Sequence, residues 1–428
     1  MTQLKDHLSA VKMFSATQEE PAWMLALRED ALSKVDEMRL PRIDQVKYFD
    51  WPLLAVAEET MEAAELPDAV GVIGFDEMQD HPLLVQYGSI TVAQQLPQSL
   101  IDQGVIFTDL FTAMKEHSEL VQAYFMTKAV KPEEDKLTAA HLAFLNSGAF
   151  LYIPKNVVLE EPVEALFYQN GMSHFFHHVL IVAEENSQFS YLERFLSDES
   201  NTTPVSANIV VEVIAKSGAQ VKFSAVDRLG KNLTTYLNRR GYLMRDAMVD
   251  WAIGVMNEGN VVADFDTDLV GDGAHSEIKV VAISGGEQVQ AIDTRVTNSG
   301  KSSIGHILQH GVIRGHGTLV FNGIGHIIKG AKGADAQQES RILMLSDGAR
   351  GDANPILLID ENEVTAGHAA SVGRVDPDEM YYLMSRGLHK EEAERLVIRG
   401  FLGSVLTAIP MKEAQKELID VIEGKLDV

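Results

Sequence analysis

The middle of this chain contains no proline between Pro204 and Pro355, and glycine interrupts it at short intervals. Proline removes a backbone donor from a strand ladder, so its absence over this length fits continuous hydrogen-bonded strands. Glycine-containing dipeptides between the apolar runs are typical of turns. The runs richest in strand-favouring residues are 208–215, 220–226, 277–283, 289–296 and 318–322. This region is therefore predicted to be a mainly β core of short strands and tight turns.

The order of residues within these runs leaves the kind of β architecture open. Polar and apolar side chains alternate from Glu277 to Val280, which indicates a strand whose two faces differ in polarity. Strands and turns at this spacing are compatible with either a β-sandwich or a β-solenoid. No strict repeat is visible in the sequence that would choose between the two.

Helical periodicity flanks the β core on both sides. Before the core, apolar residues recur at helical spacing in residues 20–36, 54–65, 110–125 and 135–144, and a strand follows at 149–153. After it, Asp376 suits an N-cap, Pro377 the first helical position and Gly387 the end of a helix. Two further helices are predicted over residues 390–406 and 412–423.

These patterns divide the chain into four predicted parts. They are a mainly helical N-terminal domain (1–150), a β core (151–355), a junction carrying His368 (356–375) and a C-terminal helical docking domain (376–428). The length of 428 residues agrees with two or three domains, and 46% hydrophobic residues provide for a large buried core.

The charge of the chain disfavours two classes of partner. Lysine and arginine number 36 against 62 aspartates and glutamates, a formal net charge of −26. A surface this acidic repels nucleic acid and anionic membranes. The N-terminal segment has charges in every apolar run, unlike a signal peptide, and no window approaches 18 uninterrupted apolar residues. We therefore expect a cytoplasmic protein that binds neither nucleic acid nor membrane.

The chain has no cysteine. Disulfides, zinc-thiolate sites and a self-contained set of iron-sulfur ligands are thereby excluded, because such clusters are normally held by thiolates. Any iron-sulfur cluster that this chain handles needs sulfur ligands from another chain.

Two fragments imitate a nucleotide site. Residues 299–302 (SGKS) resemble the end of a phosphate-binding loop. Residues 356–360 (ILLID) resemble the apolar strand of ATPases whose carboxylates bind magnesium and water. A phosphate loop needs a glycine five residues before its second glycine, and that position is Arg295. The first fragment is interpreted as an ordinary turn and the second as an ordinary strand, so no ATP site is predicted.

Two groups of histidines invite a metal interpretation. His174, His177 and His178 lie close together, and His306 and His310 are four residues apart. In a strand, however, His174 and His178 lie on one face and His177 lies on the other. Neither group contains the HExxH pattern of zinc proteases. Both groups are interpreted as packing or surface residues, and no metal site is predicted in the isolated chain.

Several motifs resemble the SufB/SufD family of iron-sulfur cluster assembly proteins. The motifs, in order, are residues 20–23 (EPAW, weakly), 320–323 (VFNG), 335–338 (DAQQ), Asn354-Pro355, 368–373 (HAASVG), 381–387 (YYLMSRG), Ala393 and Gly400-Phe401. The resemblance covers most of the chain and is closer to SufD than to SufB. SufB carries a cysteine on its β-helix near the C-terminal end, and residues 346–354 contain none here.

The resemblance implies a fold and a principal site. The fold is a right-handed parallel β-helix, or β-solenoid, flanked by N-terminal and C-terminal helical domains. In SufD proteins a histidine in the position of His368 lies at the interface with SufB and is implicated in assembling the nascent cluster. A neutral imidazole is a competent iron ligand or proton acceptor. Some family members have a cysteine two residues earlier, where this chain has Ala366.

The resemblance also implies partners. The C-terminal helices of the family bind SufC, an ABC-type ATPase, so the chain is expected to be a non-catalytic subunit whose ATPase activity resides in a partner. An apolar and aromatic strip with an arginine suits such an interface. The residues expected there are Tyr381, Tyr382, Leu383, Arg386, Gly387 and Phe401. An iron-sulfur cluster is expected only transiently, at the interface with SufB, and the isolated chain is expected to hold no cofactor and to be able to form a homodimer.

Two alternatives remain at this stage. The chain could be a SufB-like homodimeric scaffold, which the missing cysteines disfavour. It could also be a β-solenoid enzyme acting on carbohydrate, because such enzymes use paired carboxylates and Asp264, Asp266 and Asp268 alternate along one predicted strand. Acidic residues on one face more often mark a solvated face or a cation site than catalysis.

Overall fold

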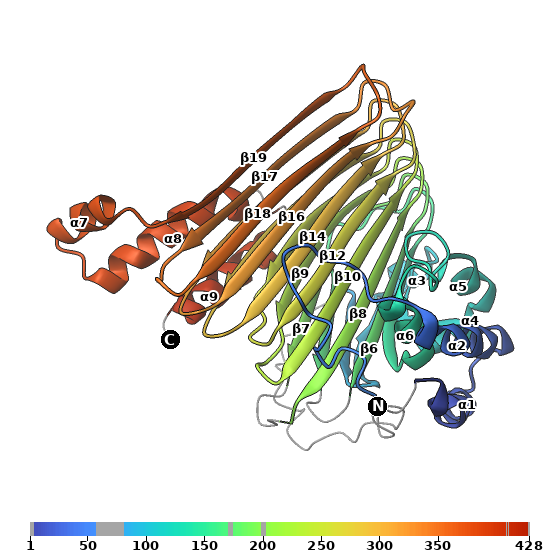
Figure 1. Ribbon diagram of the computed structural model, residues 1–428. Helices are drawn as coiled ribbons and strands as arrows, with labels where there is room; N and C mark the ends of the chain where they lie inside the picture. Colours follow the sequence, from blue (N-terminus) through green and yellow to red (C-terminus); the bar gives the residue numbers. More distant parts are fainter. Residues whose placement is uncertain are drawn as a thin grey trace.

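The computed structural model describes residues 4–56, 81–169, 174–197, 203–407, 409 and 411–426. These residues form a long β-solenoid with helices at both ends of the chain (Figure 1). From β4 onwards successive strands alternate between two sheets, so each coil adds one strand to each sheet, in about eight coils. The β-solenoid prediction is confirmed and the sandwich alternative is excluded.

The described strands form sheets of ten and nine members. The first sheet has the order β19-β17-β15-β13-β11-β9-β7-β5-β1-β2, with β1 (Leu83–Tyr87), β2 (Ile90–Gln95), β5 (Val163–Gln169), β7 (Gln188–Ser197), β9 (Gln220–Arg228), β11 (Met248–Val255), β13 (His275–Ser284), β15 (Ile304–Ile313), β17 (Asp335–Met344) and β19 (Thr365–Arg374). The second has the order β18-β16-β14-β12-β10-β8-β6-β4-β3, with β3 (Ile106–Asp109), β4 (Ser147–Ile153), β6 (Phe175–Ala183), β8 (Val205–Ala215), β10 (Leu233–Leu243), β12 (Val261–Leu269), β14 (Val289–Asn298), β16 (Thr318–Ile327) and β18 (Arg350–Ile359). Pairing is parallel except for β1 with β2 and β3 with β4.

One corner of the solenoid explains why no repeat is visible in the sequence. At this corner successive coils place a residue with positive φ, and these residues are Asn156, Asn186, Gly218, Asp246, Gly273, Ser302 and Gly333. Their backbone N–H groups donate to the next coil, as from Gly273 to the Lys301 carbonyl at 2.8 Å. Glycine, asparagine and aspartate tolerate this conformation best, so the residue type changes from coil to coil. The spacing also varies between 27 and 32 residues.

The core lies inside the solenoid. Alternate residues of each strand face inward and join one apolar cluster that extends from Leu84 to Ile342. The strand runs predicted from the proline-free region fall within β8, β9, β13, β14 and β16. Residues 299–302 form the turn between β14 and β15, and residues 356–359 belong to β18, as their interpretation as turn and strand requires.

A buried ion cluster interrupts this apolar core. The Arg239 guanidinium donates to Glu193 Oε1 at 2.8 and 3.0 Å and to the two carboxylate oxygens of Asp227 at 2.7 and 2.9 Å. All three side chains are at most 1% exposed. Burial raises the pKa of Glu193 to about 7, although Arg239 acts in the opposite direction. The cluster depends on the single cation of Arg239.

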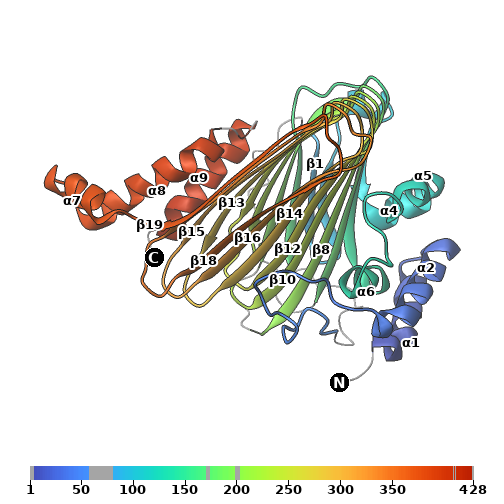
Figure 2. The same ribbon diagram turned by 45° about the horizontal axis from the view of Figure 1, so that its top comes forward.

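The helices cover the outer faces at opposite ends of the solenoid (Figure 2). Near the first coils lie α1 (Leu8–Thr17), α2 (Ala22–Lys34), α3 (Gln98–Ile101), α4 (Leu110–Glu116), α5 (Ser118–Tyr124) and α6 (Lys136–Phe144). At the other end α8 (Lys390–Leu406) packs on β13 and β15, α9 (Lys412–Leu426) packs on β9, and α7 (Pro377–Ser385) extends away. Within the described residues, no helix combines the length and apolarity needed to cross a membrane.

Most predicted helices are present. The helix predicted over 110–125 is divided at His117 into α4 and α5. Most of the helix predicted over 54–65 lies outside the described residues. At α7 the Asp376 carboxylate caps the N-terminus by accepting from the Asp378 N–H at 2.8 Å, and Gly387 follows the helix with a φ of 99°.

Candidate functional site: the open end of the solenoid

The last coil ends the solenoid with two open strand edges. Within the described residues, β18 pairs only with β16 and β19 pairs only with β17. Each end strand is ten residues long, the same length as the strand it pairs with. Exposed apolar side chains accompany these edges, with Leu358, Ile359 and Val372 between 39% and 44% exposed. Proteins usually shorten, charge or cover such edges, so this end has the features of a pairing surface.

His368 lies on β19 at this open end. Its register places it beside Gln338 of β17 and in the same row as Ile307 and Ile278. The side chains of that row face the interior, where Ile278, Ile307 and Gln338 are no more than 5% exposed. His368 is exposed because no further coil covers it. The imidazole therefore occupies an interior position of the solenoid that is open to a partner.

A groove of about 490 Å³ lies on the same sheet and crosses β13, β15, β17 and β19. His306 lies between two carboxylates, with Nδ1 3.9 Å from Glu277 Oε1 and Nε2 3.7 Å from Asp335 Oδ2. The proximity of Glu277 is the main cause that raises the pKa of His306, while the proximity of His275 and His306 lowers that of Glu277. Within the described residues, no three potential ligands are arranged to hold a metal ion.

Of the other histidine group, only His178 belongs to a buried series of hydrogen bonds that includes His141. His177 faces the interior, with its ring 4.1 Å from that of Phe167, whereas His178 faces outward toward α6. His141 Nδ1 lies 3.0 Å from Asn208 Oδ1, and His141 Nε2 lies 3.0 Å from His178 Nδ1.

The donor and acceptor of each of these hydrogen bonds follow from the orientation of the Asn208 amide. The Asn208 amide donates to the Leu137 carbonyl, so its oxygen accepts from His141. His141 then accepts from His178, whose Nε2 lies 3.2 Å from Glu212 Oε1 and is left as an acceptor. The Glu212 carboxyl accepts from two backbone N–H groups at 2.7 and 3.0 Å, and burial raises its pKa to about 8 and lowers that of His178 to about 3. These hydrogen bonds join α6 to the solenoid. The feature of the sequence that could have indicated them is a glutamate within the apolar strand β8.

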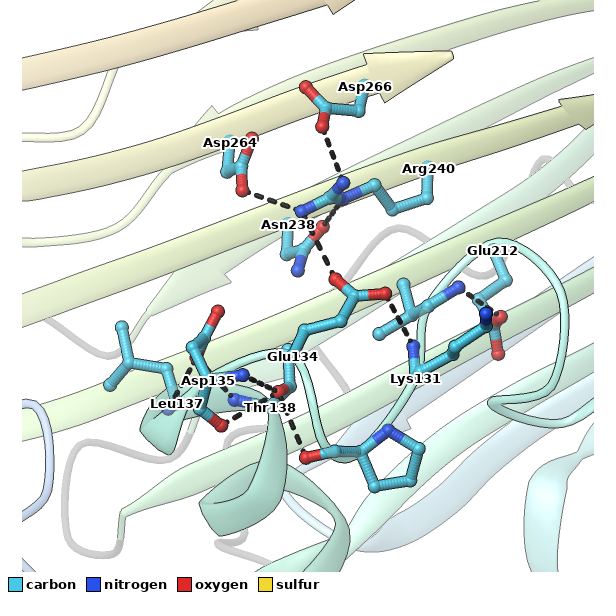
Figure 3. A network of polar contacts seen from close by, with 12 residues as sticks. Lys131, Glu134, Asp135, Leu137, Thr138, Glu212, Asn238, Arg240, Asp264 and Asp266 are labelled. Atoms are coloured by element: carbon cyan, nitrogen blue, oxygen red, sulfur yellow. Dashed lines mark hydrogen bonds and ion pairs between the residues drawn. The ribbon is translucent and has the colours of Figure 1, made fainter. Parts of the chain in front are cut away.

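Two of the three aspartates considered for a carbohydrate enzyme pair with one arginine (Figure 3). The Arg240 guanidinium lies 2.6 Å from Asp264 and 2.5 Å from Asp266, and Glu134 approaches it at 3.6 Å. Asp264 and Asp266 are on one strand and bind one cation, so they do not face each other across a groove as the two carboxylates of a glycosidase do. These contacts tie the segment before α6 to β10 and β12.

The six residues expected at the ATPase interface occupy two different surfaces. Tyr381 and Tyr382 are 73% and 56% exposed, and Arg386 lies 5.0 Å above the Tyr382 ring. Leu383 is half-buried, and Gly387 is exposed. Phe401 instead faces the solenoid, where its ring stacks on His310 at 5.0 Å. The structure therefore brings five of the six residues together on and just after α7.

Comparison with known proteins agrees with this architecture. Residues 167–401 match the model of the SufBD core domain of the SUF system for FeS cluster assembly, and residues 12–165 match the SufBD N-terminal region. The iron-sulfur cluster assembly protein SufD of Bacillus subtilis is 46% identical over 99% of both chains. A SufBD family protein of Staphylococcus saprophyticus is 27% identical over 94% of this chain and 90% of its own, and one of Staphylococcus aureus is 26% identical over the same shares. The chain belongs to the SufBD family of SUF-system iron-sulfur cluster assembly proteins and resembles its SufD members.

Proposed function

We propose that this chain is a non-catalytic, SufD-like subunit that assembles iron-sulfur clusters together with two kinds of partner. A cysteine-containing SufB-type paralogue pairs with the open end of the solenoid. A SufC-type ATPase binds the C-terminal helices, and its activity supplies the energy. The nascent cluster is cargo at the junction between the two solenoids.

The observation that carries this proposal is the position of His368 at an open solenoid end. Two parallel edges of ten residues each offer unpaired backbone groups to a second solenoid of similar width. Such pairing extends both sheets and covers Leu358, Ile359 and Val372. It also encloses His368, which enters the junction from the interior row of β19.

The chemistry of the junction requires a second chain. His368 offers one imidazole nitrogen to iron, whereas a cluster is normally held by several thiolates that this cysteine-free chain lacks. The paralogue supplies the thiolates, and His368 acts as the additional iron ligand or as a base that takes a proton from an incoming thiol.

The exposed surface of α7 supports the second interaction. Tyr381 and Tyr382 are large, rigid and largely exposed, and Arg386 lies against them. Aromatic residues and arginine are enriched where protein interfaces gain most of their energy. The helix stands away from the solenoid, so its exposed surface is accessible to a partner (Figure 2).

Reconstitution tests this proposal. The complete chain should co-purify anaerobically with a SufB-type paralogue and a SufC-type ATPase, and Tyr381→Ala combined with Tyr382→Ala should remove the ATPase alone. The His368→Ala complex should assemble normally yet lose cluster formation, measured by absorbance and by bound iron and sulfide. His326→Ala, at a half-buried histidine of β16, is the control. Unchanged cluster formation with His368→Ala would exclude the proposed role of His368.

A further inference from the structure

His310 connects the C-terminal helices to the last strands of the solenoid. It lies on β15, is 1% exposed and faces outward beneath α8. Its ring stacks on Phe401 with an interplanar angle of 26°. Polar side chains are rarely buried this completely unless specific partners bind them.

Both ring nitrogens of His310 face oxygen acceptors. Nδ1 lies 3.0 Å from the Phe401 carbonyl oxygen of α8, and Nε2 lies 3.0 Å from Glu339 Oε1 of β17. Glu339 also accepts from Arg341 at 2.9 Å. Although partial burial opposes ionisation, the hydrogen bonds from His310 and Arg341 lower the pKa of Glu339, so the carboxylate has no hydrogen to donate. The ring satisfies both neighbours only by donating from both nitrogens.

Glu339 is next to Gln338, the β17 residue that contacts both end strands. It pairs in register with Ala369, the neighbour of His368. The adjacent residue Gln338 pairs in register with His368, and its amide donates to the Ile356 carbonyl of β18 at 2.8 Å. A continuous set of hydrogen bonds and strand pairs thus leads from α8 through His310 to both end strands.

We propose that His310 is a positioning residue, which transmits displacement of the C-terminal helices to the strand that carries His368. The inference rests on the proposed function, since the ATPase is the partner that displaces these helices. Helix α8 contacts the solenoid mainly through apolar side chains, and apolar contacts are not directional. The two hydrogen bonds of His310 are directional and fix α8 to β17.

Hydrogen–deuterium exchange of residues 365–374 tests this role in the complete complex with the SufB-type paralogue and the SufC-type ATPase. ATP with magnesium should change the exchange rate of this segment by about threefold or more in the wild type. His310→Phe keeps an aromatic ring against Phe401 but loses both hydrogen bonds. The response of residues 365–374 should then disappear, while affinity for the ATPase changes by less than about threefold.

Matched variants separate this role from a purely structural one. Glu339→Gln keeps an acceptor oxygen for His310 and should retain the response, whereas Glu339→Leu should lose it. His326→Phe changes a histidine of β16 that pairs with Asp360 away from the helices, and should have no effect. An unchanged response in both His310→Phe and Glu339→Leu would overturn the inference. A wild-type chain that binds no ATPase would instead refute the proposed function on which it rests.

Discussion

Strands β17 and β19 are neighbours of equal length in one sheet, yet their side chains differ sharply in burial. Ile342 of β17 is 2% exposed, whereas Val372, its register partner on β19, is 40% exposed. The pattern of inward and outward residues continues across both strands, and only the covering coil is missing. The last coil is therefore built like an interior coil but contributes less to stability, which suits a surface kept for a partner.

The interior of the solenoid should be far more sensitive to substitution than its end. Arg239→Met leaves Glu193 and Asp227 buried without their cation, and breaking a buried pair in this way costs about 3–5 kcal/mol. Arg374 on β19 pairs with Asp347 in an exposed bridge, so Arg374→Met should cost about 0–1 kcal/mol. Urea denaturation measures both changes, and equal losses would contradict the difference between the two regions.

A second comparison uses two residues that are paired in register. Ile342→Ala opens a cavity in the core and should lower the free energy of unfolding by about 2–5 kcal/mol. Val372→Ala removes a side chain that solvent already reaches, and should lower it by less than about 1 kcal/mol. If Val372→Ala proved as costly as Ile342→Ala, the isolated chain would already bury its open end, for example in a homodimer.

The buried side chains of Glu212 and His178 should make the stability of the solenoid depend on pH. The pKa of Glu212 is raised to about 8, so its contribution is lost as pH rises from the unfolded value of about 4.5 toward 8. The pKa of His178 is lowered to about 3, so its contribution is lost as pH falls from about 6.5 toward 3. The two slopes oppose each other between about pH 4.5 and 6.5.

Of these two contributions, only that of Glu212 is still being lost above pH 6.5, and this loss should amount to about 1–2 kcal/mol by pH 8. Glu212→Gln keeps the size of the side chain and an acceptor oxygen but cannot ionise, so it should remove this loss. Urea denaturation at pH 6.5 and 8 distinguishes the variant from the wild type, and a wild-type chain that is more stable at pH 8 would contradict this pH dependence.

The sequence predicted the β core better than its end. Absent proline and alternating polarity predicted strands at 208–215, 220–226, 277–283, 289–296 and 318–322, because those strands are stabilised by their own apolar residues. The segment 365–374 (TAGHAASVGR) is rich in glycine and alanine and has little strand propensity. It forms a strand because its backbone pairs with β17. That pairing depends on the tertiary structure and cannot be seen in the local sequence.

The residues of the candidate site also differ in how well the sequence predicted them. His368 stood out only through a family resemblance, since its local pattern is typical of a turn. His310 could be noticed as one of two histidines four residues apart, but its partners Phe401 and Glu339 are 91 and 29 residues away. The sequence alone does not show which strand residues α8 covers, so the connection between helices and end strands became visible only in the structure.

The central claim is that the open end of the solenoid is the surface that pairs with a SufB-type paralogue. The most direct measurement is the affinity of Val372→Asp for that paralogue and for the SufC-type ATPase, compared with Val270→Asp at an exposed valine in a distant turn. A buried, unpaired carboxylate at the interface should weaken pairing at least about tenfold, with ATPase affinity and melting temperature unchanged. Undiminished pairing by Val372→Asp would contradict the claim and place the paralogue on another surface.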